Sequence, residues 1–298
     1  MKNRSVRFAI AAALAVVPRL LLAQPSAHYV PGAEGVLGAT LPPPGVYLRD
    51  YNYFYWADTL NGPTGNNVVS KSAKNDPFNA FVYANVPRVV WITDLKFLGG
   101  NVGVDGFLPL AYQHLEAGGY NSSTFGIGDF YGAGNLSWHV KHFDFAIASG
   151  VYAPTGDSPS QPGPSTRIGG GYWTFMQTAA ATWYIDSAKT WAVSAVNRYE
   201  FNTEQRDTHI TPGDAYTLDW GVSKKVCKEA DLGVAGYYQQ QVTSSAGQPL
   251  NRVAAVGPEV VVTFPNQALF VSLRYNYEFM AENRMQGNAI TMTLTKRF

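Results

Sequence analysis

Short segments in which apolar and polar side chains alternate recur from Gly45 to the end of the chain. The clearest is 269–279, where Leu269, Val271, Leu273, Tyr275, Tyr277 and Phe279 alternate with Ser272, Arg274, Asn276 and Glu278. Successive side chains of a β-strand point to opposite faces, so one face of this segment suits lipid and the other suits water. Segments 191–201, 216–223 and 290–295 repeat the pattern. This period is typical of transmembrane β-strands.

Counting these segments gives about twelve strands, an even number, as in bacterial barrels of a single chain. The predicted strands are 45–57, 78–92, 100–112, 125–138, 143–153, 172–186, 190–202, 214–224, 231–242, 253–264, 268–280 and 289–298. Short connections at 93–99, 139–142, 187–189, 225–230 and 265–267 alternate with longer ones at 58–77, 113–124, 154–171, 203–213, 243–252 and 281–288. The sequence therefore predicts an all-β fold, a single antiparallel transmembrane β-barrel over 45–298 with short periplasmic turns and longer extracellular loops.

The composition excludes several other classes of protein. Charged residues make up 14% of the 298 residues and aromatic residues another 14%, whereas about 25% of a soluble protein is charged. After the first two dozen residues the chain has no run of about 18 apolar residues, which argues against membrane-spanning helices. The formal net charge of +1 indicates no basic surface for nucleic acid. Lipid contact explains this composition better than the core of a soluble β-sandwich does.

Aromatic residues gather near the ends of the predicted strands. Tyr51, Tyr53, Phe54, Tyr55 and Trp56 precede the first loop, and Tyr275, Tyr277 and Phe279 precede the last. Because amphipathic rings favour the headgroup level of a membrane, these residues predict aromatic girdles at the two interfaces.

Both ends of the chain indicate export to a membrane. Lys2, Arg4 and Arg7 precede an apolar stretch at 8–17, which predicts a signal peptide over residues 1–23. An uncleaved anchor is the alternative, but the apolar stretch is short for a span. The last residue, Phe298, is in phase with the apolar residues of the final segment. Ending on an aromatic residue resembles the assembly signal of outer-membrane barrels, although Lys296 departs from the usual apolar residue.

Three sequence stretches resemble a known family. They are His28-Tyr29-Val30-Pro31-Gly32, Leu41-Pro42-Pro43-Pro44-Gly45-Val46-Tyr47, and Gly150-Val151-Tyr152-Ala153-Pro154-Thr155-Gly156-Asp157. From about residue 28 to the C-terminus the chain resembles the family labelled "putative meta-pathway of phenol degradation". The resemblance implies an outer-membrane channel for passive uptake of small molecules, hydrophobic or aromatic ones among them. It implies no catalytic residue.

A barrel of about twelve strands has a narrow lumen, because eight strands leave room only for side chains and 16–18 leave an open channel. The predicted lumen-facing charges, which are candidates for selecting solute or for pairing across the interior, are Arg198, Glu200, Asp219, Arg274 and Glu278. The Pro- and Gly-rich segment 24–44 lacks a strand pattern. We expect either a plug in or across the lumen, carrying His28 and Tyr29, or a disordered periplasmic leader.

Two alternative functions belong to other classes. An outer-membrane barrel enzyme acting on lipids, of phospholipase or deacylase type, would use Ser and His, and a structural or adhesive barrel would use its loops. The histidines are His28, His114, His139, His142 and His209, and spacing pairs none of them with a serine and a carboxylate. We therefore predict no enzyme, no cofactor and no metal site. The expected partners are outer-membrane lipid, the barrel assembly machinery and a small-molecule solute, with no nucleic acid.

Overall fold

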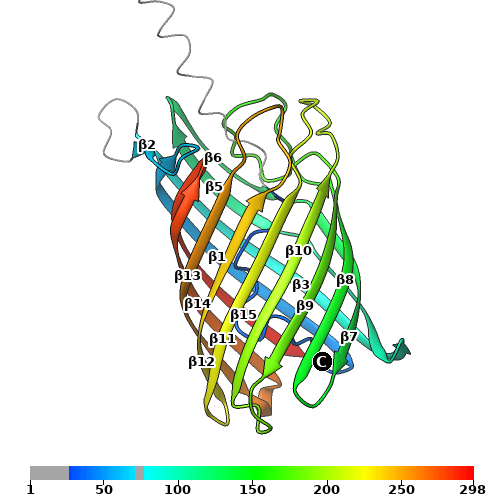
Figure 1. The fold of residues 1–298 in the computed structure, drawn as a ribbon. Helices are drawn as coiled ribbons and strands as arrows, with labels where there is room; N and C mark the ends of the chain where they lie inside the picture. Colours follow the sequence, from blue (N-terminus) through cyan, green and yellow to red (C-terminus); the bar gives the residue numbers. More distant parts are fainter. Residues whose placement is uncertain (1–26, 71–76) are drawn as a thin grey trace, which may run out of the picture.

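The computed structural model describes residues 27–70 and 77–298, and its strands form one closed antiparallel sheet (Figure 1). The predicted signal peptide, residues 1–23, lies outside the described residues. The strands are β1 Gly45–Asn61, β2 Asn67–Ser70, β3 Asn79–Phe97, β4 Gly100–Phe107, β5 Leu110–Ala117, β6 Tyr120–Ile127, β7 Phe130–His139, β8 Phe143–Ala153, β9 Thr174–Tyr184, β10 Trp191–Asn202, β11 Ala215–Cys227, β12 Ala230–Gln241, β13 Arg252–Phe264, β14 Leu269–Glu282 and β15 Arg284–Arg297. A 3₁₀ turn, η2 Pro265–Gln267, connects β13 and β14. Among the described residues, no helix has the length and apolar character needed to cross a membrane.

These elements make a barrel wall of twelve strands, as predicted. β4 and β5 are two parts of one wall strand, because both pair with β3 on either side of an interruption at Leu108 and Pro109. β6 and β7 form the next wall strand, interrupted at Gly128 and Asp129. β2 is a short arm that pairs with the outer end of β1. Pairing of β1 with β15 from Tyr47 to Asn61 closes the cylinder.

One end of the cylinder carries short turns and the other carries most of the long loops. The turn side has the connections 98–99, 140–142, 185–190, 228–229 and 265–268, and the loop side has 154–173, 203–214 and 242–251. By the usual geometry of these barrels the turn side faces the periplasm. In Figure 1 the turns lie at the bottom, together with the C-terminus.

Two of the predicted long connections, 113–124 and 281–288, are wrong. β5 continues to Ala117 and β6 begins at Tyr120, so Gly118 and Gly119 alone make this connection, both with positive φ. Glycine adopts that conformation without steric cost. β14 and β15 are separated by Asn283 alone. Strand ends that extend beyond the membrane have no lipid to face, so they lack the apolar alternation that marks a strand in the sequence.

The outer surface of the wall is apolar and the inner surface is polar. Exposed outward side chains include Trp91, Ile147, Phe175, Leu273 and Phe279. Contiguous apolar surface on this scale marks contact with membrane or protein. The residues between them in sequence point inward and are buried, as Arg274, Asn276 and Glu278 are in β14. Alternation in the sequence thus corresponds to lipid on one face and lumen on the other.

The predicted aromatic girdle is wrong for part of the first strand. Phe54 and Trp56 face outward, but Tyr51, Tyr53 and Tyr55 alternate with them and face the lumen. Buried phenol groups need hydrogen-bond partners, and the hydroxyls of Tyr51 and Tyr55 donate to buried carboxylates there.

We predict that Leu273→Arg destabilises the barrel by about 2–4 kcal/mol, the cost of a cation on the lipid face near the bilayer midplane. Reversible urea unfolding in phospholipid vesicles measures this difference. The control is Gln248→Arg, in the loop between β12 and β13, which we expect to leave stability unchanged. Equal stability of the two variants would contradict the assignment of this face to lipid.

Candidate functional site

Residues 27–44, which we call the leader, lie inside the barrel and run along its length (Figure 1). His28 Nδ1 lies 2.6 Å from Thr174 Oγ1, at the first residue of β9. The Thr40 hydroxyl donates to Thr182 Oγ1 at 3.0 Å, close to the last residue of the same strand. The leader therefore crosses the lumen from the loop side to the turn side, where it enters β1.

The loop-side end of the leader is held by buried polar groups. His28 Nε2 lies 2.8 Å from Asp129 Oδ2, and the His28 ring stacks on Tyr152 with the ring centroids 4.9 Å apart. The Tyr29 hydroxyl donates to Asp219, and the Tyr29 backbone N–H donates to Glu200 Oε1 at 3.0 Å. Both residues that we predicted in the plug thus contact the inner wall.

The centre of the leader approaches the wall so closely that a Cβ added at two of its glycines would force side chains of the wall to move. A Cβ on Gly35 would overlap the side chains of Arg274 and Glu259. A Cβ on Gly32 would overlap the ring of Tyr237, and its φ of +79° is one that glycine adopts readily. The wall side chains also bind the leader backbone: Arg274 Nη2 donates to the Gly32 carbonyl at 2.7 Å, and Glu259 accepts from the Val36 N–H at 2.8 Å.

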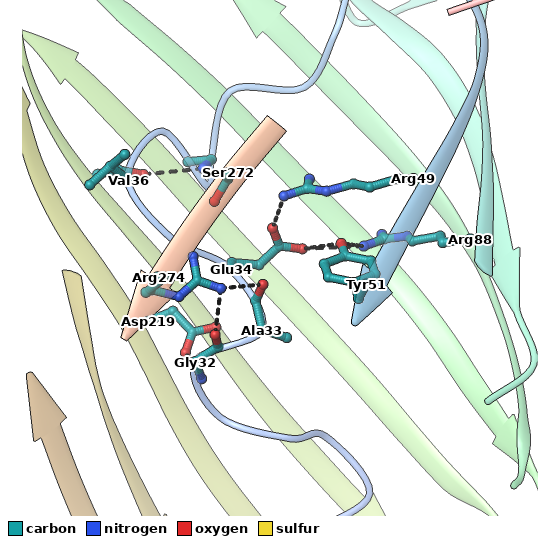
Figure 2. A network of polar contacts seen from close by, with 12 residues as sticks. Gly32, Ala33, Glu34, Val36, Arg49, Tyr51, Arg88, Asp219, Ser272 and Arg274 are labelled. Atoms are coloured by element: carbon teal, nitrogen blue, oxygen red, sulfur yellow. Dashed lines mark hydrogen bonds and ion pairs between the residues drawn. The ribbon is translucent and has the colours of Figure 1, made fainter. Parts of the chain in front are cut away.

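Glu34 is the charged centre of the leader, and Figure 2 shows it surrounded by side chains of the wall. Arg49 Nη2 lies 2.8 Å from Glu34 Oε2, and Arg88 Nη1 donates to Oε1 at 3.2 Å. Tyr51 donates its hydroxyl to the same oxygen at 3.2 Å. Arg198 Nη2 is 3.7 Å from Oε1. We call Arg49, Arg88 and Tyr51 the carboxylate cradle.

Arg88 of the cradle and the neighbouring Arg198 and Arg274 each have a wall carboxylate as partner. The distances are 2.8 Å for Arg88 and Asp105, 2.9 Å for Arg198 and Asp219, and 3.1 Å for Arg274 and Glu259. All of these side chains are largely withdrawn from solvent, where an ion left without its partner is costly. The pairs therefore hold the inner wall together at the level where the leader crosses it.

The structure places all five predicted charges on the inner side of the wall, where they are buried: Arg198, Glu200, Asp219, Arg274 and Glu278. The first four contact the leader. Glu278 instead accepts hydrogen bonds from Tyr55 and Tyr237 at 2.9 and 2.8 Å. The sequence reasoning missed the cradle and Glu34. A usable signal existed, because Glu34 is the sole acidic residue of segment 24–44.

A cavity of about 630 Å³ lies beside the leader on the turn side. Glu34, Arg49 and Arg88 border it, together with the apolar groups of Val90, Phe107, Tyr131, Ala146, Tyr152, Met176 and Val196. Tyr29, Tyr131, Tyr152 and Met176 pack together and close its inner end. The volume lies in the range of small-molecule sites.

The remaining histidines do not assemble a catalytic triad in the described residues. His114 Nδ1 lies 3.0 Å from Ser123 Oγ on the outer face, but no side chain of the described residues orients the other ring nitrogen of His114. His139 contacts Asp144, and His209 contacts Glu204 in an exposed loop. Within the same ranges, no group of three potential metal ligands occurs. Hydrolysis by a serine nucleophile needs a base and a group that orients the base. The pair of His114 and Ser123 therefore supports no proposal of hydrolysis.

Comparison with known proteins identifies both a family and a fold. The family model described as "Putative MetA-pathway of phenol degradation" matches residues 57–294. An outer-membrane channel of Pseudomonas putida F1 is 14% identical with a TM-score of 0.76, covering 91% of this chain and 100% of that one. The beta domain of the Bordetella autotransporter BrkA is 10% identical with a TM-score of 0.51, covering 85% and 99%. A search of curated protein sequences found no match. The chain therefore has the fold of a bacterial outer-membrane β-barrel.

We predict that Arg274→Met destabilises the barrel by about 3–5 kcal/mol, because Glu259 would stay buried without its cation. The double variant Arg274→Met, Glu259→Gln should recover much of this loss, since no uncompensated charge remains. Urea unfolding in vesicles compares the three proteins. If Arg274→Met were as stable as the parent, the ion pair of Arg274 and Glu259 would be exposed to water and not buried.

Proposed function

The chain belongs to the "Putative MetA-pathway of phenol degradation" family, and from this premise we propose that it is an outer-membrane channel for passive uptake of small molecules. The observation that carries the proposal is the cavity of about 630 Å³ within the lumen. It lies inside a closed barrel whose outer face suits lipid, and a permeating solute must pass through this interior.

The lining of the cavity favours a solute with an apolar body. Phe107, Tyr131, Tyr152 and Met176 present rings and a thioether to it. Small-molecule sites are mostly apolar, with a few polar groups that set orientation. A hydrophobic or aromatic molecule of small size fits these surroundings.

The leader serves as the plug of this channel. Its contacts with β9, β10, β11, β13 and β14 fill the narrow part of the lumen. Four charged residues of the wall hold the leader in place: Arg198, Glu200, Asp219 and Arg274. The position of the leader then determines which solutes can pass. Glu278 stabilises the opposite wall through its two tyrosines.

Phe298 is proposed as the signal read by the barrel assembly machinery. It follows the last residue of β15 on the turn side, its side chain is exposed, and its N–H donates to the Val46 carbonyl at 3.0 Å. The final strand is thus fixed by backbone pairing, while its terminal ring stays accessible to a partner.

Deletion of residues 24–40 should raise single-channel conductance several-fold in planar bilayers, because the segment fills the lumen. Swelling of liposomes with a panel of sugars, aromatic acids and neutral aromatic compounds then measures which solutes pass. The control is deletion of 244–249 in the loop between β12 and β13, which we expect to leave conductance unchanged. Conductance that does not respond to loss of the leader would remove the plug from the proposal.

A further inference from the structure

One arginine of the inner wall forms its ion pair with the leader and not with the wall. The wall contributes four arginines at this level, Arg49, Arg88, Arg198 and Arg274, but three of them already have wall carboxylates. Within the described residues the ion partner of Arg49 is Glu34 alone. The leader thus supplies the carboxylate that pairs with Arg49, and Figure 2 shows Glu34 between Arg49 and Arg88.

We propose that the carboxylate cradle is a binding site for the carboxylate of a small organic acid, and that Glu34 occupies it when the channel is closed. The inference rests on the channel function proposed above and names the class of solute. An acid that enters the cradle displaces Glu34, removes an anchor of the leader and opens the lumen.

The cradle can be reached from the cavity. Glu34, Arg49 and Arg88 all border it, and the side chain of Arg49 is 26% exposed. Arg49 Nε is buried and has no hydrogen-bond partner in the part of the chain that the structure describes, so a carboxylate that takes the place of Glu34 would find a further donor there. A guanidinium offers a planar fork that binds a carboxylate through two parallel hydrogen bonds, and a mobile acid can adopt that geometry.

The rest of the cavity determines which kind of group can be attached to the carboxylate of the ligand. Val90, Phe107, Tyr131 and Val196 lie near the cradle and offer apolar contacts. Lys189 lies at the turn-side mouth, with Nζ 4.1 Å from the centroid of the Tyr184 ring, and adds a positive charge there to those of the cradle. A carboxylate joined to an aromatic or aliphatic body of small size matches both regions.

Competition between Glu34 and the acid predicts opposite effects for two variants of the full-length chain. Glu34→Gln removes the competitor, so radiolabelled benzoate should bind about 10-fold more tightly to the protein in lipid nanodiscs. Arg49→Gln removes the fork, so benzoate should bind at least about 10-fold more weakly. Benzamide, which has the same ring without the charge, should not compete for the site. The control Arg252→Gln alters a rim arginine that pairs with Glu282 and should bind benzoate like the parent.

Conductance of the same proteins in planar bilayers tests opening. Benzoate should raise the conductance of the parent, whereas benzamide should not, and Glu34→Gln should conduct more without any addition. Weaker binding in both variants, or equal effects of benzoate and benzamide, would overturn the inference.

If Arg49→Gln does not fold, as judged by heat-modifiable migration in gels, Arg49→Lys replaces it and should still weaken binding, because lysine lacks the fork. A protein that conducts no ions and admits no solute, with or without its leader, would contradict the channel function, whereas a conducting channel indifferent to benzoate contradicts this inference alone.

Discussion

Backbone pairing between the first and last strands of the wall is the constraint on which the rest of the structure depends. Lipid offers no hydrogen bonds, so an open sheet edge in a membrane leaves several costly unpaired groups, and closure removes them. β1 and β15 pair over nearly their whole length. Closure also separates two environments, which explains why apolar side chains face outward and ion pairs lie inside.

A closed wall of this size also encloses charged side chains that need partners, and the leader provides some of these partners. Arginines and carboxylates inside a narrow lumen are partly removed from water and need partners. The leader lies among them with backbone N–H and carbonyl groups as well as the Glu34 carboxylate. Its glycines let the backbone itself approach the wall, so the leader is held by polar contacts rather than by an apolar core.

Much of this fold could be predicted from the sequence, because each membrane-embedded strand carries its own alternation. For segment 269–279 the alternation predicted correctly which side chains face lipid and which face the lumen. The number of strands followed from repetition of that pattern. The turns at Gly118 and Asn283 could not be found in this way, since strand ends outside the membrane have no apolar face.

The site was predictable in part. The charges in β10, β11 and β14 stand out because they interrupt apolar alternation, as Arg198 and Arg274 do. Arg49 lies between Tyr47 and Tyr51, and inward tyrosines look the same in the sequence as rings at a membrane interface. Its pairing with Glu34 joins a strand to an irregular segment, and no periodic pattern records such a contact.

The covalent link between the leader and β1 has a consequence for the proposed displacement of the leader. A segment joined to the wall at Gly45 returns to its place in an intramolecular step, and short flexible tethers give effective concentrations on the order of millimolar. Anything free in solution that displaces it must be comparably abundant or make better contacts. If the leader is displaced as we propose, this tether sets a threshold concentration, and a solute far below the millimolar range would not displace it.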